Sequence, residues 1–316
     1  MPGDRARRVL VTGAAGFLGG HCAGELQRRG HEVVTTDRRG AVACLGDLAD
    51  RNFLATLPDV DTVVHAAGVQ YISPDLPLFS RRPWFHRNNV EATRNLVDRY
   101  RDVADHFVYV STSMTYAQQG GPLGAGTPRE AQGPYSASKL LAESYVTARA
   151  SRAATVVPCI IAGDGRAGLF VPFVRSMRRF RFALVPGSGR TKVNLVHVED
   201  VSGLIAVVVE TRASGTFNAG GPDAVSLLDW VDEVEQALDL PAVRRLTIPF
   251  RAVQGMSACL AYRPLAQEQV KMLNHDHVLS LAESVSLGWT PRWTNREIVR
   301  DTARALAGLG RPTRAN

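Results

Sequence analysis

The chain has 316 residues, of which 45% are hydrophobic and 21% charged, so it can bury a large core in one large domain or two unequal ones. Its formal net charge is +7, but the arginines are dispersed and not interleaved with aromatic residues, which argues against nucleic-acid binding. No run approaches about 18 consecutive apolar residues, which excludes a membrane-spanning helix.

The first half of the chain alternates apolar runs with amphipathic segments, which is typical of a parallel sheet covered by helices on both faces. Gly30 ends the first predicted helix, and Pro134 stands in the first turn of another, where each residue is favoured. We therefore expect an α/β fold with a Rossmann-type, doubly wound parallel sheet. The predicted helices cover residues 21–30, 84–100 and 134–150, and the predicted strands residues 8–12, 31–37, 42–47, 60–68, 106–112 and 154–160.

The regular alternation ends near residue 163. Beyond it, short strands at 182–186, 216–221 and 244–250 mix with helices in no regular order. We therefore predict a dinucleotide-binding domain over residues 1–163, with the catalytic residues included. Residues 164–316 are expected to form mainly a smaller α/β substrate-binding lobe, with some segments returning to the sheet.

The cysteine and histidine patterns predict neither disulfides nor a metal site. The four cysteines are far apart without a CxxC pair, so we expect free thiols in a reducing cytoplasm. His275 and His277 could bind a metal on a strand, but "NHDH" is typical of a solvated loop.

A glycine-rich turn, "VTGAAGFLGG", stands between the first predicted strand and helix. Gly13, Gly16 and Gly19 suit a tight turn, a close approach of the backbone to a pyrophosphate, and close packing of helix on strand. The following helix offers free N–H groups and the positive end of its dipole to phosphates. The turn therefore predicts a dinucleotide cofactor.

Asp37, at the end of the second predicted strand, bears on which dinucleotide is bound. It follows Gly16 by 21 residues, a position suited to the hydroxyls of the adenosine ribose, which favours NAD. Arg38 and Arg39 come next and could instead meet a 2′-phosphate, so NADP remains possible.

"YSASK" places Tyr135 four residues before Lys139, one of only three lysines in the chain. On a helix, residues at this spacing lie on one face, so a phenol and an ammonium would share one space. A free phenol has a pKa of about 10, and a nearby cation favours its ionised form, so the pair could exchange a proton with a substrate. The alternative is a pair of surface side chains.

Taken together, these motifs resemble those of the extended short-chain dehydrogenases/reductases, the NAD-dependent epimerase/dehydratase superfamily. The resemblance covers nearly the whole chain, and the segment 163–200 is similar to the 3β-hydroxysteroid dehydrogenase-like branch. It implies an NAD(P)-dependent oxidoreductase that works as a homodimer on a small molecule. The matching motifs are TGAAGFLG, GDL, HAAG, NNVEATRNL, FVYVSTSMTYA, PYSASKLLAE, VHVEDV, GTFNAGG and LGWTP.

The resemblance also implies the site residues. Thr112, four residues before Tyr116 in the fifth-strand motif, would hold the reacting oxygen beside Tyr135 and Lys139. Glu91 and Glu143 are expected to be surface charges, and His65 a strand-end residue near the cofactor. The implied cofactor contacts are Gly13, Ala15, Gly16, Phe17, Leu18, Gly19, Asp37, Arg38, Asp47, Leu48, Ala66, Ala67, Gly68, Tyr135, Lys139, Pro158 and Ile161. The implied substrate contacts are Gln70, Tyr71, Ser113, Met114 and Arg190.

Departures from the family pattern reduce the number of reactions that the chain is expected to catalyse. Ser113 and Met114 stand where 4,6-dehydratases carry Asp-Glu, so the acid–base pair for eliminating water is missing. Val157, Ile160 and Val193 replace an Arg, an Asn and an Arg of sugar-nucleotide epimerases.

These replacements favour a hydrophobic or polyketide-like alcohol or ketone as the substrate, because apolar residues would leave the phosphates of a nucleotide sugar without partners. The insert 69–87, which follows the fourth predicted strand, is expected to form part of the substrate entrance. The alternative is a nucleotide-sugar 4-epimerase or ketoreductase that binds phosphate through Arg166, Arg175 or Arg190. A cofactor-sensing regulator on this fold would usually lack the Tyr and the Lys, and both are present.

Overall fold

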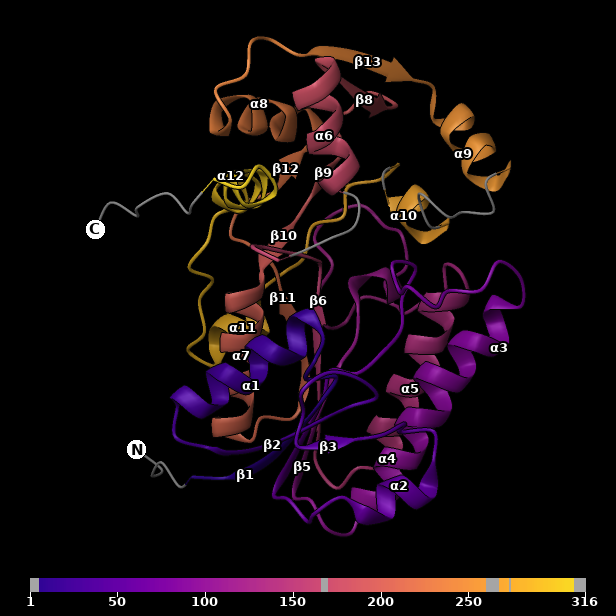
Figure 1. The fold of residues 1–316 in the computed structure, drawn as a ribbon, viewed down its shortest axis with the longest axis vertical. Helices are drawn as coiled ribbons and strands as arrows, with labels where there is room; N and C mark the ends of the chain where they lie inside the picture. The colour runs from indigo at the N-terminus through magenta and orange to yellow at the C-terminus, as the bar shows by residue number, and fades with distance from the viewer. Residues whose placement is uncertain (1–5, 166–169, 260–266, 273, 310–316) are drawn as a thin grey trace.

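The computed structural model describes residues 6–165, 170–259, 267–272 and 274–309, and a seven-stranded parallel sheet forms its centre (Figure 1). Every hydrogen-bonded pair of neighbouring strands in this sheet is parallel. In sheet order the strands are β3 (Cys44–Leu45), β2 (Glu32–Asp37), β1 (Arg8–Thr12), β4 (Thr62–His65), β5 (His106–Val110), β6 (Ala153–Pro158) and β11 (Gly215–Ala219).

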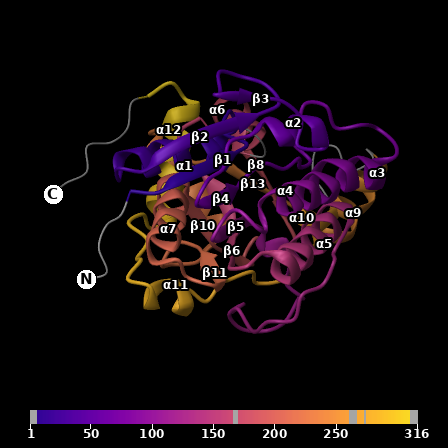
Figure 2. The same ribbon diagram turned by 90° about the horizontal axis from the view of Figure 1, so that it is seen from below.

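Helices cover both faces of the sheet, as Figures 1 and 2 show. One face carries α1 (Phe17–Arg28) and α7 (Val198–Thr211). The other carries α2 (Arg51–Thr56), α4 (Ala92–Tyr100) and α5 (Pro134–Arg149). The doubly wound, Rossmann-type α/β fold predicted from the sequence is therefore confirmed.

The apolar pattern of the strands explains why both faces are covered. Successive side chains on a strand point to opposite faces. On β1, Val9 and Val11 therefore pack in the core with α1 and α7, whereas Leu10 packs in the core with α4 and α5. All three side chains are completely buried. A strand buried on both faces must be apolar at every position, and "VLV" meets that requirement.

The order of the strands places a crevice at one edge of the sheet. From β1 the chain runs outward through β2 and β3, then crosses back to β4 and runs outward in the other direction through β5 and β6. The change of direction lies between β1 and β4, which are hydrogen-bonded neighbours. In open α/β sheets, ligands bind outside the carboxyl ends of the strands at such a point.

A second group of elements lies above the sheet in Figure 1. Its core contains buried side chains from α6, α8 and α12, among them Met177, Val231 and Ile298. Its helices are α6 (Phe170–Phe180), α8 (Leu227–Ala237), α9 (Phe250–Cys259), α10 (Gln267–Met272) and α12 (Asn295–Leu306). Its strands are β7 (Ile160–Ala162), β8 (Phe182–Pro186), β9 (Lys192–Val193), β10 (Leu195–His197), β12 (Val225–Ser226) and β13 (Arg244–Ile248).

The chain passes between the two groups more than once. After β10 it returns to cover the sheet with α7 and to add β11, which pairs with β6; later, α11 (Ala282–Ser286) packs beside β11. The predicted strand 216–221 thus belongs to the large sheet. The division at residue 163 remains a prediction.

Most element bounds differ from the sequence prediction by a few residues; the first helix, for example, begins at Phe17. The strand predicted over 42–47 is only Cys44–Leu45, because it pairs at the edge of the sheet with the last two residues of β2. The strand predicted over 60–68 ends at His65, after which the chain turns into the crevice. The helix predicted over 84–100 starts earlier as α3 (Arg81–Phe85) and continues through a π-helical segment, η1 (His86–Glu91), before α4.

Candidate active site

A cavity of about 540 Å³ lies at the carboxyl ends of the central strands. Residues that end or follow β1, β2, β4, β5 and β6 form its wall, including Gly13, Asp37, Ala66, Ser111 and Pro158. Every residue that the sequence predicted to contact the cofactor lines this cavity: Gly13, Ala15, Gly16, Phe17, Leu18, Gly19, Asp37, Arg38, Asp47, Leu48, Ala66, Ala67, Gly68, Tyr135, Lys139, Pro158 and Ile161.

The glycine turn is tight enough to require glycine at two of its positions. Gly13 has a φ of +70°, and a Cβ there would lie 2.7 Å from the Cα of Ala67. A Cβ on Gly19 would overlap the carbonyl oxygen of Gly13. These contacts bring the start of α1 against β1 and β4, so the first N–H groups of the helix face the cavity. The turn forms a cradle for phosphate groups.

Asp37 is fixed at one end of the cavity by two backbone donors. Its Oδ2 accepts a hydrogen bond from the N–H of Ala15 at 3.1 Å, and its Oδ1 accepts one from the N–H of Arg38 at 2.7 Å. The carboxylate therefore has a set orientation before any ligand binds.

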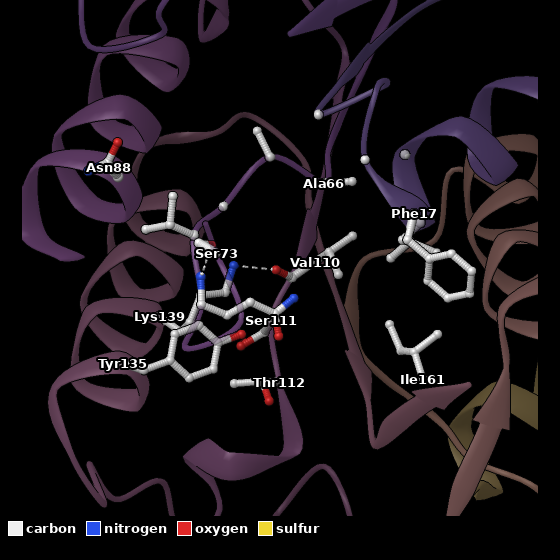
Figure 3. Close-up of a pocket in the computed structure, with 18 of the residues that line it drawn as sticks. Phe17, Ala66, Ser73, Asn88, Val110, Ser111, Thr112, Tyr135, Lys139 and Ile161 are labelled. Atoms are coloured by element: carbon white, nitrogen blue, oxygen red, sulfur yellow. Dashed lines mark hydrogen bonds between the residues drawn. The ribbon is translucent and has the colours of Figure 1, made fainter. Parts of the chain in front are cut away.

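The predicted catalytic residues Thr112, Tyr135 and Lys139 line the same cavity and gather on one side of it (Figure 3). Tyr135 and Lys139 come from the first turns of α5, whereas Thr112 follows β5. The ring of Tyr135 packs against the rings of Tyr71 and Phe85, with centroids 6.0 and 5.7 Å away. The phenol thus has a fixed position at the cavity wall.

Lys139 is a buried ammonium with only 5% of its surface exposed. Its Nζ donates a hydrogen bond of 2.6 Å to the carbonyl oxygen of Val110 and lies 4.3 Å from the centre of the Tyr109 ring. Burial lowers the pKa of Lys139 from 10.5 to about 7, and the nearby carboxylate of Glu143 opposes that shift. The charge is therefore held close to Tyr135 at a cost in desolvation.

Glu143 corrects a prediction from the sequence, because it is not a surface charge. It is 8% exposed, and its Oε2 accepts a hydrogen bond of 2.6 Å from the hydroxyl of Ser111. Its Oε1 lies 3.3 Å from Nη2 of Arg129, whose guanidinium covers the Tyr116 ring at 4.1 Å. This network fixes the segment that carries Thr112. Glu91, by contrast, has a 51% exposed side chain, as predicted.

His65 is completely enclosed and carries no charge. Its two ring nitrogens lie 2.7 Å from the hydroxyl of Thr12 and 2.8 Å from that of Thr93. Burial, with the charge of Lys139, lowers the pKa of His65 from 6.5 to about 3. It joins β1, β4 and α4 beneath the cavity.

Three of the five predicted substrate residues line the cavity and two do not. Gln70, Ser113 and Met114 line the cavity, whereas Tyr71 supports Tyr135 from behind. Arg190 lies outside the site, exposed on the turn that follows β8. Its placement follows from Gly187 and Gly189, whose positive φ angles bend the chain there.

The residues that distinguished the chain from sugar-nucleotide epimerases also divide. Ile160 lines the cavity, but Val157 is completely buried in the sheet core and Val193 is buried in β9. The apolar replacement of substrate contacts therefore depends on Ile160 alone. Arg175 is exposed on α6 outside the cavity, and Arg166 falls outside the described residues.

The site includes a part of the chain that sequence reasoning missed. Gln269 and Met272 of α10 line the cavity. Beside them, Glu268 is 2% exposed and its Oε1 accepts hydrogen bonds from the N–H groups of Tyr135 at 3.1 Å and Ser136 at 3.2 Å. A carboxylate at the first turn of a helix is favourable to the helix dipole. No spacing in the sequence relates residue 268 to residue 135, so only the fold could reveal this contact.

Within the described ranges, no group of three or more His, Cys, Asp or Glu side chains could hold a metal ion. The "NHDH" segment is not wholly solvated as predicted, because His277 is 2% exposed where it pairs with β9.

The fold and the site together define an α/β dinucleotide-dependent enzyme of the extended short-chain dehydrogenase/reductase type. The model of the NAD dependent epimerase/dehydratase family matches residues 9–220, so the chain belongs to that family. Its cofactor is accordingly NAD, and the Gly13–Gly19 cradle with the fixed carboxylate of Asp37 fits it.

Individual relatives differ in their reactions. The chain is 27% identical over 272 residues to the dTDP-D-glucose 4,6-dehydratase of Mus musculus, covering 75% of this chain and 74% of that protein. It is 29% identical over 323 aligned positions to the 2-alkyl-3-oxoalkanoate reductase of Stenotrophomonas maltophilia, covering 93% and 92%. The solved structure of MoeE5 in complex with UDP-glucuronic acid and NAD has a TM-score of 0.77 at 24% identity, covering 95% of this chain and 99% of that one.

Among the helices of the described residues, none is both long and apolar enough to cross a membrane.

Substituting Glu143→Gln should destabilise the protein by about 2–4 kcal/mol, because it leaves the mostly buried Arg129 without its counter-ion. The amide oxygen of the glutamine can still accept the hydrogen bond from Ser111, so the change in stability reports the loss of the Glu143 charge alone. Urea denaturation measures it. The matched control Glu130→Gln, on an exposed side chain next to Arg129, should stay within about 0.5 kcal/mol of the wild type. Equal effects of the two variants would contradict the buried ion pair.

Substituting Lys139→Met should change the stability of the cofactor-free protein in a pH-dependent way. Below pH 7 the folded state bears the full cost of a buried ammonium, and this cost disappears as the pH rises from about 7 towards 10.5, where the unfolded chain also loses its proton. We expect a gain of about 1–3 kcal/mol at pH 6, since the lost bond to Val110 offsets part of the relief.

The gain should be much smaller at pH 9.5. Urea denaturation at the two pH values checks this, with the exposed Lys192→Met as the control. A stability difference that is the same at both pH values would show that Lys139 is not a destabilised ammonium.

Proposed function

We propose that the protein is an NAD-dependent ketoreductase or alcohol dehydrogenase for a secondary alcohol or ketone of a hydrophobic or polyketide-like small molecule. The observation that carries this proposal is the wall around Thr112, Tyr135 and Lys139. Arg38 and Arg39 are the other cationic side chains among the described residues of the cavity, and both belong to its Asp37 end. The other lining side chains that follow β4, β5 or β6 or lie on α10 are uncharged, among them the apolar Met114, Ile160 and Met272, and the polar Gln70, Ser113 and Gln269.

Tyr135 is the proton donor and acceptor in this proposal. In the reducing direction, its phenol gives a proton to the carbonyl oxygen and regains one from solvent. An NAD held by the Gly13–Gly19 turn and Asp37 would supply the hydride chemistry at the carbonyl carbon, in either direction. The Thr112 hydroxyl would hold the same oxygen, and an ammonium at Lys139 would favour the negative charge on the phenol oxygen when the proton leaves.

Two observations separate this proposal from dehydration. The only carboxylates among the described cavity residues are Asp37 and Asp47, which lie with the adenosine contacts. Ser113 and Met114 supply no acid–base pair for removing water. The likeness to the 2-alkyl-3-oxoalkanoate reductase, which extends over more than nine-tenths of both chains, supports a ketone substrate with an apolar part.

A nucleotide-sugar 4-epimerase or nucleotide-sugar ketoreductase is the second candidate. It is favoured by similarity to UDP-glucose 4-epimerases, such as 30% identity over 156 residues to that of Streptococcus mutans, although this covers only 44% of the chain. Because this match covers less than half of the chain, it gives no information on the substrate-binding residues in the rest of the chain.

We also propose that the protein works in the cytoplasm as a homodimer. The wide spacing of its cysteines, none of which forms a disulfide in the described residues, supports a reducing compartment. The exposed Leu141 on α5 supports pairing through that helix, as the family resemblance implies.

Substituting Tyr135→Phe should lower kcat/KM by at least about 10³-fold while NADH affinity stays within about twofold, because only the proton-transferring oxygen is lost. Lys139→Ala should reduce both kcat/KM and the affinity for NADH. Turnover and NADH fluorescence titration measure the two properties. Tyr145→Phe, on the same helix but bonded to Asp98, is the matched control and should keep its activity. Near wild-type turnover of Tyr135→Phe would remove Tyr135 from the mechanism.

The reaction itself is tested by following NADH absorbance with a panel of cyclic and aromatic ketones, with UDP- and dTDP-sugars in parallel. A ketoreductase consumes NADH stoichiometrically, whereas an epimerase returns its hydride and shows no net change. Sugar isomers formed without net NADH change, at roughly 10⁴ M⁻¹s⁻¹ or more, would overturn the proposal in favour of the second candidate.

A further inference from the structure

Two arginines follow Asp37 at the adenosine end of the cavity, and both line it. An arginine at this position is the side chain that accommodates the 2′-phosphate of NADP. The sequence therefore leaves a contradiction: Asp37 favours the ribose hydroxyls of NAD, while Arg38 and Arg39 suit the phosphate of NADP. The contacts of the two guanidinium groups resolve it.

The Arg38 guanidinium is engaged on both of its terminal nitrogens. Its Nη2 lies 2.7 Å from Oδ2 of Asp75, and its Nη1 donates a hydrogen bond of 3.0 Å to Oδ1 of Asn88. Arg39 turns to the same carboxylate, with its Nη2 at 3.9 Å from Oδ1 of Asp75. One acidic side chain thus faces both arginines.

Asp75 belongs to the insert between β4 and α3, 37 residues beyond Arg38 in the chain. Asn88 is itself oriented, because its amide nitrogen donates to the carbonyl oxygen of Trp84 at 2.8 Å. The insert therefore presents Arg38 with a counter-charge, and η1 presents it with an acceptor of fixed direction, both from outside the Rossmann turn.

We propose that Asp75 is a specificity-determining residue that makes the site prefer NAD over NADP by pairing with Arg38 and Arg39. With Asp75 in place, Asp37 and Asp75 balance the two arginines, and a 2′-phosphate would meet two carboxylates. Without Asp75, the arginines would exceed the acids by one charge and Arg38 would be available to the phosphate. NAD has no phosphate there and is indifferent to this change.

The size of the effect follows from the exposure of the pair. The side chains of Arg38 and Asp75 are 30% and 41% exposed, so solvent screens their attraction. Such pairs contribute up to about 1 kcal/mol, which corresponds to about fivefold in a binding constant. A change of about three- to fivefold in cofactor preference is therefore expected.

The test is the ratio of the NADPH and NADH dissociation constants, measured by fluorescence titration of the purified full chain at fixed ionic strength. Asp75→Asn keeps the shape of the side chain and removes its charge. It should lower the ratio about three- to fivefold, through tighter NADPH binding. Combining it with Arg38→Met should cancel the gain, because the freed guanidinium is then absent.

Asp102→Asn is the matched control, since it makes the same change of net charge at an exposed position beyond α4 and outside the cavity. It should leave the ratio unchanged. A ratio for Asp75→Asn within twofold of the wild type, or an equal weakening of both cofactors, would overturn the proposal. The readout is binding alone, so it does not depend on which substrate the enzyme turns over.

Discussion

The buried ammonium of Lys139 is the interaction on which the arrangement of this site depends. Burial makes the charge unfavourable, and the protein supports it with the Val110 carbonyl, the face of Tyr109 and the carboxylate of Glu143. Each support fixes something else. Because Val110 is the last residue of β5 and Glu143 also binds Ser111, the same contacts hold the segment that ends in Thr112. The position of one charge therefore sets the position of the group that would bind the reacting oxygen.

The second feature of the site is that its wall comes from two distant parts of the chain. The cofactor side consists of residues that follow the parallel strands, whereas α10 brings Gln269 and Met272 to the Tyr135 side. Glu268 attaches α10 to the first turn of α5 through the N–H groups of Tyr135 and Ser136. The amides that begin the helix carrying Tyr135 are thus satisfied by a side chain from the C-terminal part of the chain. The part of the cavity wall that α10 forms is therefore connected directly to the helix that carries Tyr135.

Paired charges also organise the adenosine end. Arg87 of η1 lies 2.8 Å from Asp47, in the same way that Arg38 lies against Asp75. Both pairs join the β2–β3 side of the cavity to the segment between β4 and α4. Hydrogen bonds from Arg87 and from the N–H of Ala49 lower the pKa of Asp47 despite its burial. Asp47 and Asp75 are therefore paired with arginines and Asp37 accepts from two backbone N–H groups, which leaves the cradle of backbone N–H groups in the glycine turn as the place for the cofactor phosphates.

The sequence by itself determined the fold, the cofactor turn and the Tyr135–Lys139 pair, because these depend on local spacing. Apolar runs specify buried parallel strands, glycines specify a turn that a Cβ would block, and a spacing of four puts two side chains on one helix face. Only the tertiary structure decided the burial of Glu143, the position of α10, the exposure of Arg190 and the engagement of Arg38 by Asp75. These depend on which residues far apart in the chain meet, and charge or hydropathy at one position says nothing about its partner. The sequence could therefore indicate the class of chemistry, while the partners of each charged group required the fold.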